Sequence, residues 1–269
     1  MRLTINHTTR YQYSQPARYA IQYLRLTPKS DASQQVLNWR LKAPGRLNQH
    51  IDGFGNIMHV MVVDEMHNEM TISVEGEVES YDTNGVLPGA EELLPPEVFL
   101  NPTPLTHADT VVRDFAEGMR AAINAETLDG LHELSRAVAA RVAYRPESTN
   151  VETTAAAALT AGSGVCQDQA HVFTATARYL GIPTRYVSGY FHAIGEGIGE
   201  AASHAWSESW VDGLGWVAFD VTNEICASDA HVRLAVGPDY DACAPIRGVR
   251  RGGGIEQMDV KVTVAAQDQ

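Results

Sequence analysis

A cysteine, a histidine and an aspartate lie in chain order in three segments whose patterns suit covalent catalysis. Cys166 follows Ser163-Gly164-Val165 and precedes an apolar-periodic stretch, and His204 and Asp220 lie downstream. A thiol nucleophile needs an imidazole that takes its proton and an acid that fixes the imidazole tautomer. We therefore predict Cys166 as nucleophile, His204 as base and Asp220 as orienting acid.

The segment after Gly164 has the pattern of a helix that begins at Cys166. Gly181 and Pro183 end it, and its apolar residues recur at steps of three or four, at Ala170, Phe173, Ala177 and Leu180. A thiol in the first helical turn faces unpaired N–H groups and the positive end of the helix dipole. These groups favour a thiolate and can receive the oxyanion of a tetrahedral intermediate.

A predicted hairpin relates the histidine to the acid. The turn signal Asp212-Gly213-Leu214-Gly215 separates two stretches rich in aromatic and β-branched residues. If Trp210 pairs with Leu214, His204 falls directly opposite Asp220, with Cβ atoms about 5 Å apart. A slip of one residue would move the carboxylate to the other face of the sheet. The hairpin thus predicts His204 and Asp220 as direct cross-strand neighbours.

Several segments closely resemble the bacterial transglutaminase-like family of cysteine proteases. The resemblance lies in Gly164-Val165-Cys166-Gln167-Asp168-Gln169-Ala170-His171, Ser203-His204-Ala205-Trp206, Gly215-Trp216-Val217-Ala218-Phe219-Asp220-Val221-Thr222-Asn223 and the tail from His231 to Gly248. It covers nearly the whole chain; Val221 departs from the family pattern, where proline is expected. It implies an α+β fold with a papain-like core, in which the cysteine helix packs on an antiparallel sheet, preceded by a β-rich N-terminal domain.

Further residues near the three candidates have both structural and functional interpretations. Tyr144 is a candidate second oxyanion donor through its hydroxyl. Asp168 either favours the helix dipole or takes part in catalysis. Trp206 is either a core residue or a wall of the acyl pocket, and Asn223 is expected to fix the chain after Asp220 by side-chain hydrogen bonds.

Composition excludes several classes of function. The net charge is −13, and the densest basic stretch, Arg247-Gly248-Val249-Arg250-Arg251, is too short for a nucleic-acid site. No run of apolar residues is long enough for a membrane span. The three cysteines do not form a disulfide framework, so we expect free thiols in a reducing compartment, the cytoplasm. No close-spaced cysteine or histidine pair predicts a metal, and no cofactor is expected.

The chain divides into three parts by its patterns. Residues 1–84 read as a β-rich domain, residues 85–106 as a proline-rich linker and residues 107–269 as the transglutaminase-like catalytic domain. Helices are predicted at about 107–124, 128–143 and 152–160, and strands near Arg185–Phe191 and 257–265. The sequence leaves open which sheet the last strand joins.

The predicted reaction is attack on an amide, peptide or isopeptide bond through a thioester at Cys166. Hydrolysis is favoured, because neither a calcium loop nor an amine site is visible. Acyl transfer to an amine, the transglutaminase reaction, is the first alternative. A non-catalytic binding scaffold that kept the fold is the second. The expected partner is a peptide or another amide-containing substrate.

Overall fold

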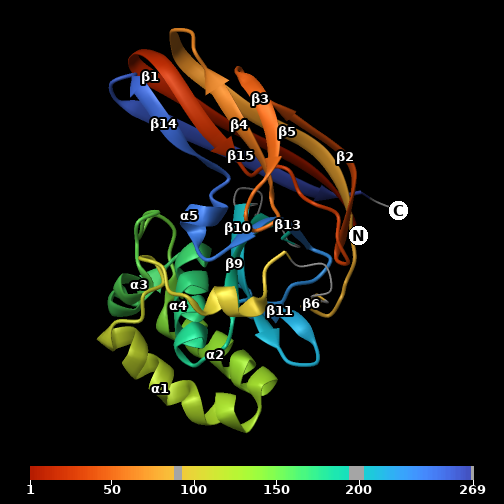
Figure 1. Ribbon diagram of the computed structural model, residues 1–269, viewed down its shortest axis with the longest axis vertical. Helices are drawn as coiled ribbons and strands as arrows, with labels where there is room; N and C mark the ends of the chain where they lie inside the picture. The colour runs from red at the N-terminus through yellow and green to blue at the C-terminus, as the bar shows by residue number, and fades with distance from the viewer. Residues whose placement is uncertain (88–92, 194–202, 268–269) are drawn as a thin grey trace.

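Two antiparallel sheets and a group of helices build the protein (Figure 1). The structure is a computed structural model and describes residues 1–87, 93–193 and 203–267. The first sheet lies at one end, the helices lie at the other, and the second sheet lies between them. Seven of the described strands form the first sheet: β1 (Arg2–Leu24), β2 (Gln34–Lys42), β3 (Arg46–Ile51), β4 (Ile57–Val63), β5 (His67–Ser80), β14 (Ile246–Gly252) and β15 (Glu256–Ala266).

The long strand β1 organises the first sheet. Its first half lies between β5 and β15, and its second half lies between β4 and β14. Its side chains alternate between exposed and buried, as expected for a strand with one covered face. The buried set in the first half is odd-numbered and consists of Leu3, Ile5, His7, Thr9, Tyr11 and Tyr13. This face of β1 turns toward the second sheet, where Leu3 and Ile5 pack with Val232 and Leu234.

The second sheet carries two of the three candidate catalytic residues. Its order is β12-β11-β10-β9-β13, with β6 paired to β11. The strands are β6 (Val86–Leu87), β9 (Thr184–Phe191), β10 (Ser203–Val211), β11 (Gly215–Asp220), β12 (Ile225–Cys226) and β13 (His231–Gly237). A separate parallel pair joins β7 (Ala143–Tyr144) to β8 (Ser163–Gly164).

The described α-helices lie on one side of this second sheet (Figure 1). They are α1 (Thr110–Ala125), α2 (Thr127–Arg141), α3 (Ala155–Ala161), α4 (Cys166–Tyr179) and α5 (Tyr240–Cys243), and a 3-10 helix, η1 (Pro96–Leu100), precedes them. The predicted helix that starts at Cys166 is confirmed, and Leu180 forms its C-terminal cap. Phe173 of α4 stacks on Phe219 of β11, with ring centroids 5.2 Å apart. This contact anchors the nucleophile helix to the sheet.

The hairpin register differs from the prediction by two residues. Trp210 pairs with Trp216 and Val211 pairs with Gly215, so the three-residue turn spans 212–214. Gly213 and Gly215 both have positive φ, at 83° and 100°, a conformation that glycine adopts without strain. Because the shift is even, the His204 and Asp220 side chains still emerge on one face. They are diagonal neighbours and not directly opposite.

The segment that the sequence assigned to a linker packs against the catalytic half. Phe99 of η1 is buried and makes an edge contact with Trp216, with ring centroids 5.4 Å apart. The buried guanidinium of Arg178 donates to Thr106 Oγ1 at 2.9 Å and to Pro238 O at 2.8 Å. Burial lowers the Arg178 pKa to about 10. This arginine thus joins the linker region to α4 and to the chain after β13.

The last two strands return to the first sheet. His7 of β1 pairs with Val262 of β15, and Ile21 pairs with Val249 of β14. The sequence placed residues 246–266 in the catalytic domain, but their strands extend the N-terminal sheet. The division at residues 84 and 106 stays a prediction. No helix within the described parts of the chain is both long and apolar enough to cross a membrane.

Side chains from the first sheet and its loops hold the edge of the second sheet. Gln34 Nε2 donates to Arg233 O and Gln34 Oε1 accepts the Arg233 N–H, each at 2.8 Å. Asn56 makes the same pair of 2.8 Å bonds to the backbone of Val236. Both amides bond to β13 as a neighbouring strand would. They fix the position of one sheet on the other.

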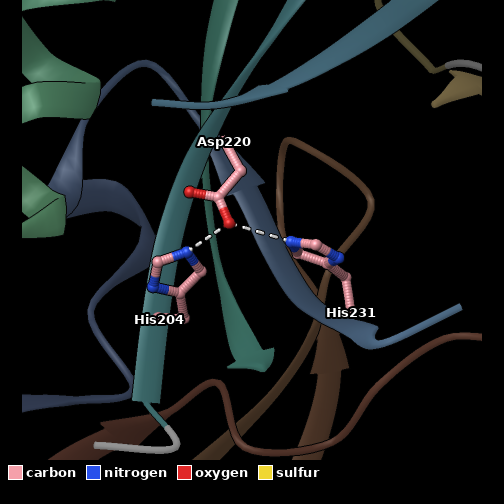
Figure 2. A group of neighbouring side chains, drawn as sticks. All are labelled: His204, Asp220 and His231. Atoms are coloured by element: carbon pink, nitrogen blue, oxygen red, sulfur yellow. Dashed lines mark hydrogen bonds and ion pairs between the residues drawn. The ribbon is translucent and has the colours of Figure 1, made fainter. Parts of the chain in front are cut away.

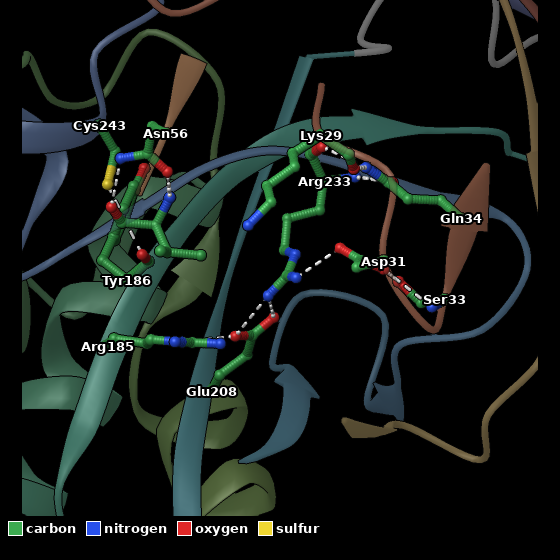
Figure 3. A network of polar contacts seen from close by, with 11 residues as sticks. Lys29, Asp31, Ser33, Gln34, Asn56, Arg185, Tyr186, Glu208, Arg233 and Cys243 are labelled. Atoms are coloured by element: carbon green, nitrogen blue, oxygen red, sulfur yellow. Dashed lines mark hydrogen bonds and ion pairs between the residues drawn. The ribbon is translucent and has the colours of Figure 1, made fainter. Parts of the chain in front are cut away.

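Charged side chains add to the contact between the two sheets (Figure 3). Arg185 Nε donates to Glu208 Oε2 at 2.7 Å, and both side chains are almost fully buried. Arg233 Nη1 lies 3.3 Å from the same Glu208 oxygen, and its Nη2 donates to Asp31 of the N-terminal half. Burial acts to raise the Asp31 pKa, but the Arg233 guanidinium outweighs it and holds the pKa below its usual value. The network therefore continues from the catalytic sheet into the first half of the chain.

Candidate active site

Cys166 is the first residue of α4, and Asp168 holds the turn that presents it. Asp168 Oδ2 accepts the Val165 N–H at 2.8 Å and the Thr149 hydroxyl at 2.6 Å. A Cβ on Gly164 would lie 2.6 Å from Asp168 Cβ, so this position needs glycine. Burial raises the Asp168 pKa against these hydrogen bonds. Asp168 thus affects the position of the thiol indirectly, because it holds the backbone turn that precedes Cys166.

His204, at the start of β10, contacts both of its predicted partners. Its Nε2–H donates to Asp220 Oδ2 at 2.8 Å, which leaves Nδ1 available for a second partner. The Cys166 thiol lies within hydrogen-bond reach of the ring. Burial acts to lower the His204 pKa, but Asp220 and Cys166 outweigh it and raise the pKa to about 10. This environment therefore favours the protonated ring of His204.

Asp220 is fully buried and is surrounded by donors. Asn223 donates its Nδ2–H to Oδ2 at 2.6 Å and its backbone N–H to Oδ1 at 3.2 Å. Burial acts to raise the Asp220 pKa, but hydrogen bonds from His204 and His231 hold it well below its usual value. The carboxylate therefore stays ionised and can fix the imidazole. Asn223 thus ties the chain that follows Asp220 to the Asp220 carboxylate, which is the role that the sequence suggested for it.

A second histidine, His231, shares the carboxylate oxygen (Figure 2). Its Nε2 lies 3.0 Å from Asp220 Oδ2, and its Nδ1 accepts the Ser228 N–H at 3.1 Å. A nitrogen that accepts an N–H carries no proton, so the Nε2 atom of the neutral ring must carry it. His231 was not among the site residues predicted from the sequence. The available signal was that His231 opens the tail segment that resembles the family.

The same atoms have the spacing of a metal site. One ligand atom each of His204, Asp220 and His231 lies within 4.8 Å of the other two. A neutral imidazole bound to a metal through Nε2 carries its proton on Nδ1. At His231 that proton would point at the Ser228 N–H, so two donors would oppose each other. The hydrogen bonds fit a carboxylate shared by two N–H groups better than a metal.

Tyr144 and Trp206 lie on different sides of this cluster. Tyr144 pairs with Gly164 beside the cysteine loop. Burial, followed by the nearby Cys166, raises the Tyr144 pKa. Its role as an oxyanion donor stays a prediction. Trp206 is buried, its ring centroid is 5.2 Å from that of His231, and it is absent from the described lining of the cavity at Cys166. Trp206 thus packs against the rings of His204 and His231 and is not part of the described cavity wall.

Cys166 and His204 open onto a cavity of about 270 Å³. Its described lining comes from both halves of the chain and includes Tyr11 of β1, Tyr240 of α5 and Met258 of β15. A larger cavity, of about 470 Å³, lies near Lys29 and Arg233 and contains none of the candidate catalytic residues. The smaller cavity is therefore the candidate substrate site.

Comparisons with known sequences identify relatives of both the N-terminal region and the part that contains the three candidate residues. Residues 3–79 match the bacterial transglutaminase-like N-terminal region, and residues 113–221 match the transglutaminase-like superfamily. An uncharacterized protein of Mycobacterium leprae is 31% identical over 281 aligned residues, which cover 98% of each chain. An uncharacterized protein of Mycobacterium tuberculosis is 28% identical, over 92% of this chain and 87% of its own.

A solved structure shares the fold over its full extent. The crystal structure of a "putative cysteine protease" from Cytophaga hutchinsonii aligns with 100% of this chain and 91% of its own, with a TM-score of 0.79 and 21% identity. At this identity the likeness establishes the transglutaminase-like fold alone. Together with the full-length sequence relative, it shows that this chain belongs to the transglutaminase-like superfamily and carries the family's bacterial N-terminal region.

Proposed function

We propose that this protein is a Cys-His-Asp enzyme that hydrolyses amide, peptide or isopeptide bonds through a thioester. The observation that carries the proposal is the position of His204. Its ring lies between the Asp220 carboxylate, at 2.8 Å, and the Cys166 thiol, beside a cavity that can admit a substrate. A nucleophile, a base and an orienting acid in hydrogen-bond contact are what acyl transfer requires.

Acylation follows from this arrangement. With the thiol proton on His204 Nδ1, Cys166 Sγ attacks the carbonyl carbon to form a tetrahedral intermediate. Unpaired N–H groups of the first α4 turn are positioned to stabilise its oxyanion. The His204 imidazolium then donates the proton to the departing amine as the C–N bond breaks. The products are a thioester on Cys166 and a free amine.

Deacylation decides between hydrolysis and transfer. Neutral His204 takes a proton from the attacking water, which adds to the thioester carbonyl. The C–S bond breaks, Cys166 regains its proton, and a carboxylic acid leaves. A primary amine in place of water would give a new amide by the same steps.

We also propose a peptide or other amide-containing substrate and a cytoplasmic location. All three cysteines, Cys166, Cys226 and Cys243, are free, which supports a reducing compartment. The net charge of −13 supports a substrate other than nucleic acid.

Intact mass spectrometry with a panel of amides and esters tests the reaction. We expect an acyl adduct on the wild-type chain and none on Cys166→Ala. With a productive donor, a titration of primary amine should leave hydrolysis dominant. A transferase binds its amine in a site that excludes water, so saturable and nearly complete amine incorporation would establish transfer instead. The absence of any acyl adduct across the panel would support the scaffold alternative.

A further inference from the structure

The N-terminal sheet forms one wall of the cavity at Cys166. Thr9 pairs with Val260, and Tyr11 pairs with Met258, across the β1–β15 ladder. All four line the cavity, together with Cys166 and His204 of the catalytic half. Because residues two apart on a strand share a face, these two cross-strand pairs form one continuous surface.

The described lining of this cavity lacks acidic and basic side chains apart from its histidines and Cys166. It contains no lysine, arginine, aspartate or glutamate. His7, the other imidazole in the lining, bonds to the Tyr190 hydroxyl at 2.8 Å and to Thr9 Oγ1 at 2.9 Å. Burial lowers the His7 pKa to about 4, so the ring is neutral near pH 7. A charged substrate side chain would lose its hydration here without gaining an ionic partner.

The wall is a fixed part of the fold. Leu3 and Ile5 of β1 pack with Val232 and Leu234 of β13 in one apolar cluster. The His7–Tyr190 hydrogen bond continues this contact toward the cavity. A surface held by a shared core is preorganised, so binding to it requires little ordering of the protein.

The cavity is large enough to admit a substrate side chain. Its volume of about 270 Å³ is slightly below the range of about 300–1,000 Å³ that is usual for drug-sized ligands. Met258 is 61% exposed and Tyr11 is 7% exposed. The cavity wall therefore has a solvent-exposed part at Met258, which we call the rim, and a buried part at Tyr11. A side chain attached to an extended substrate could enter at the rim.

We propose that this cavity is the acyl-side pocket and selects an uncharged apolar side chain, of leucine or phenylalanine size, next to the reacting carbonyl. The inference rests on the proposed role of Cys166 and deepens it by naming the substrate class. It also gives the first sheet a function, since its strands β1 and β15 supply the surface that contacts the substrate side chain.

A series of chloromethyl ketones tests this preference without requiring turnover. The reagents are N-acetyl-amino-acid chloromethyl ketones that carry a phenylalanine, leucine, alanine, lysine or glutamate side chain. The Cys166 thiolate displaces chloride, so a C–S bond forms, a C–Cl bond breaks and intact mass reports the rate. Each rate is divided by that of iodoacetamide, which carries no side chain. We expect the normalised rates of the phenylalanine and leucine reagents to exceed those of the others about tenfold, because one well-packed apolar group in a pocket changes the rate by about that factor.

Two matched variants locate the preference. Met258→Glu places a charge on the wall, and Val249→Glu places one at a similarly exposed apolar residue of β14 that is absent from the described lining. Met258 and Val249 are 61% and 67% exposed, so neither change disturbs the core. In Met258→Glu the phenylalanine-to-iodoacetamide ratio should fall about tenfold and the lysine ratio should rise. In Val249→Glu both ratios should equal those of wild type.

Two results would overturn the pocket. One is a phenylalanine reagent that reacts no faster than the alanine reagent. The other is an equal loss of preference in both glutamate variants. Failure of iodoacetamide to modify Cys166 would instead contradict the nucleophile. The pocket would then be tested on Cys166→Ala by titration with N-acetyl-phenylalaninamide, followed by methionine methyl NMR. A saturable shift of the Met258 methyl supports the pocket, and its absence overturns it.

Discussion

His231 Nε2 lies 3.0 Å from Asp220 Oδ2, the oxygen that also accepts the hydrogen bond from His204 (Figure 2). Figure 2 shows the His204 ring to the left of this oxygen and the His231 ring to its right. The catalytic acid therefore has two imidazole donors, and only His204 also reaches the thiol. In the proposed mechanism His231 is a positioning residue, because it would act on the reaction through Asp220.

Loss of the His231 donor should weaken catalysis and change its pH dependence. We expect His231→Leu to lower the Cys166 acylation rate about 10- to 100-fold, the effect of one hydrogen bond to a charged group. With one donor fewer, Asp220 should take up a proton more readily, so the acid limb of the pH–rate profile should move to higher pH. Stopped-flow acylation across pH measures both effects.

The conservative variant separates positioning from packing. Glutamine can place an amide N–H near the position of His231 Nε2, so His231→Gln should keep more activity and a nearly normal acid limb. Equal losses in the leucine and glutamine variants, with an unmoved acid limb, would show that His231 only fills space.

Replacement of Asp220 should lower turnover strongly and leave the fold intact. An asparagine at position 220 offers one acceptor oxygen, where the carboxylate accepts from His204, His231 and Asn223. We expect Asp220→Asn to lower turnover by about three to four orders of magnitude. Circular dichroism should show a native fold. Asp212→Asn, in the exposed hairpin turn, removes the same charge and should keep wild-type turnover, which controls for net charge.

The three thiols should differ sharply in reactivity. Burial raises the Cys226 pKa, and it raises the pKa of the fully buried Cys243 well above the usual value. Cys166 is accessible and lies beside the His204 ring. Iodoacetamide at mildly acidic pH should therefore modify Cys166 first, as measured by peptide mapping over time. His204→Gln should slow the labelling of Cys166 alone. Equal rates at Cys166 and Cys226 would contradict the assignment.

The His204–Asp220 pair should stabilise the fold over a defined pH window. The His204 pKa is raised from 6.5 to about 10, so its contribution is complete below pH 6.5 and is lost as pH rises toward 10. The Asp220 pKa is lowered from 3.8, so its contribution is present above that value and is lost as pH falls below it. The melting-temperature gap between wild type and Asp220→Asn should be largest between pH 4 and 6.5 and should narrow toward pH 10. A gap that stays constant from pH 5 to 10 would contradict this coupling.

Local sequence carried the information for the nucleophile helix. Its glycine entry, its periodicity and its stop signals all lie within about 20 residues, and the helix begins at Cys166 as predicted. The hairpin was located by its turn residues, but its register was wrong. The choice of pairing depends on which glycines adopt positive φ, and Gly213 and Gly215 both do. The even size of the shift preserved the common face of His204 and Asp220.

Features that depend on distant pairing were not predictable in this way. His231 reaches Asp220 because β13 lies beside β9 and the chain turns at Ser228, and no spacing rule encodes that approach. The wall of the cavity joins Tyr11 to Met258, residues that lie at opposite ends of the chain. Alternating polarity predicted strands at both places, but it could not select their partners.

The pairing of β1 with β15 also sets an order of events during synthesis. Residues 256–266 emerge from the ribosome after all three candidate catalytic residues. Until they pair with β1, the inward face of that strand lacks Met258 and Val260 as neighbours. A nascent chain can therefore assemble its cysteine helix and second sheet before it has a complete substrate surface. Substrate selection by the proposed pocket would thus require β15 as well as the part of the chain that carries Cys166, His204 and Asp220.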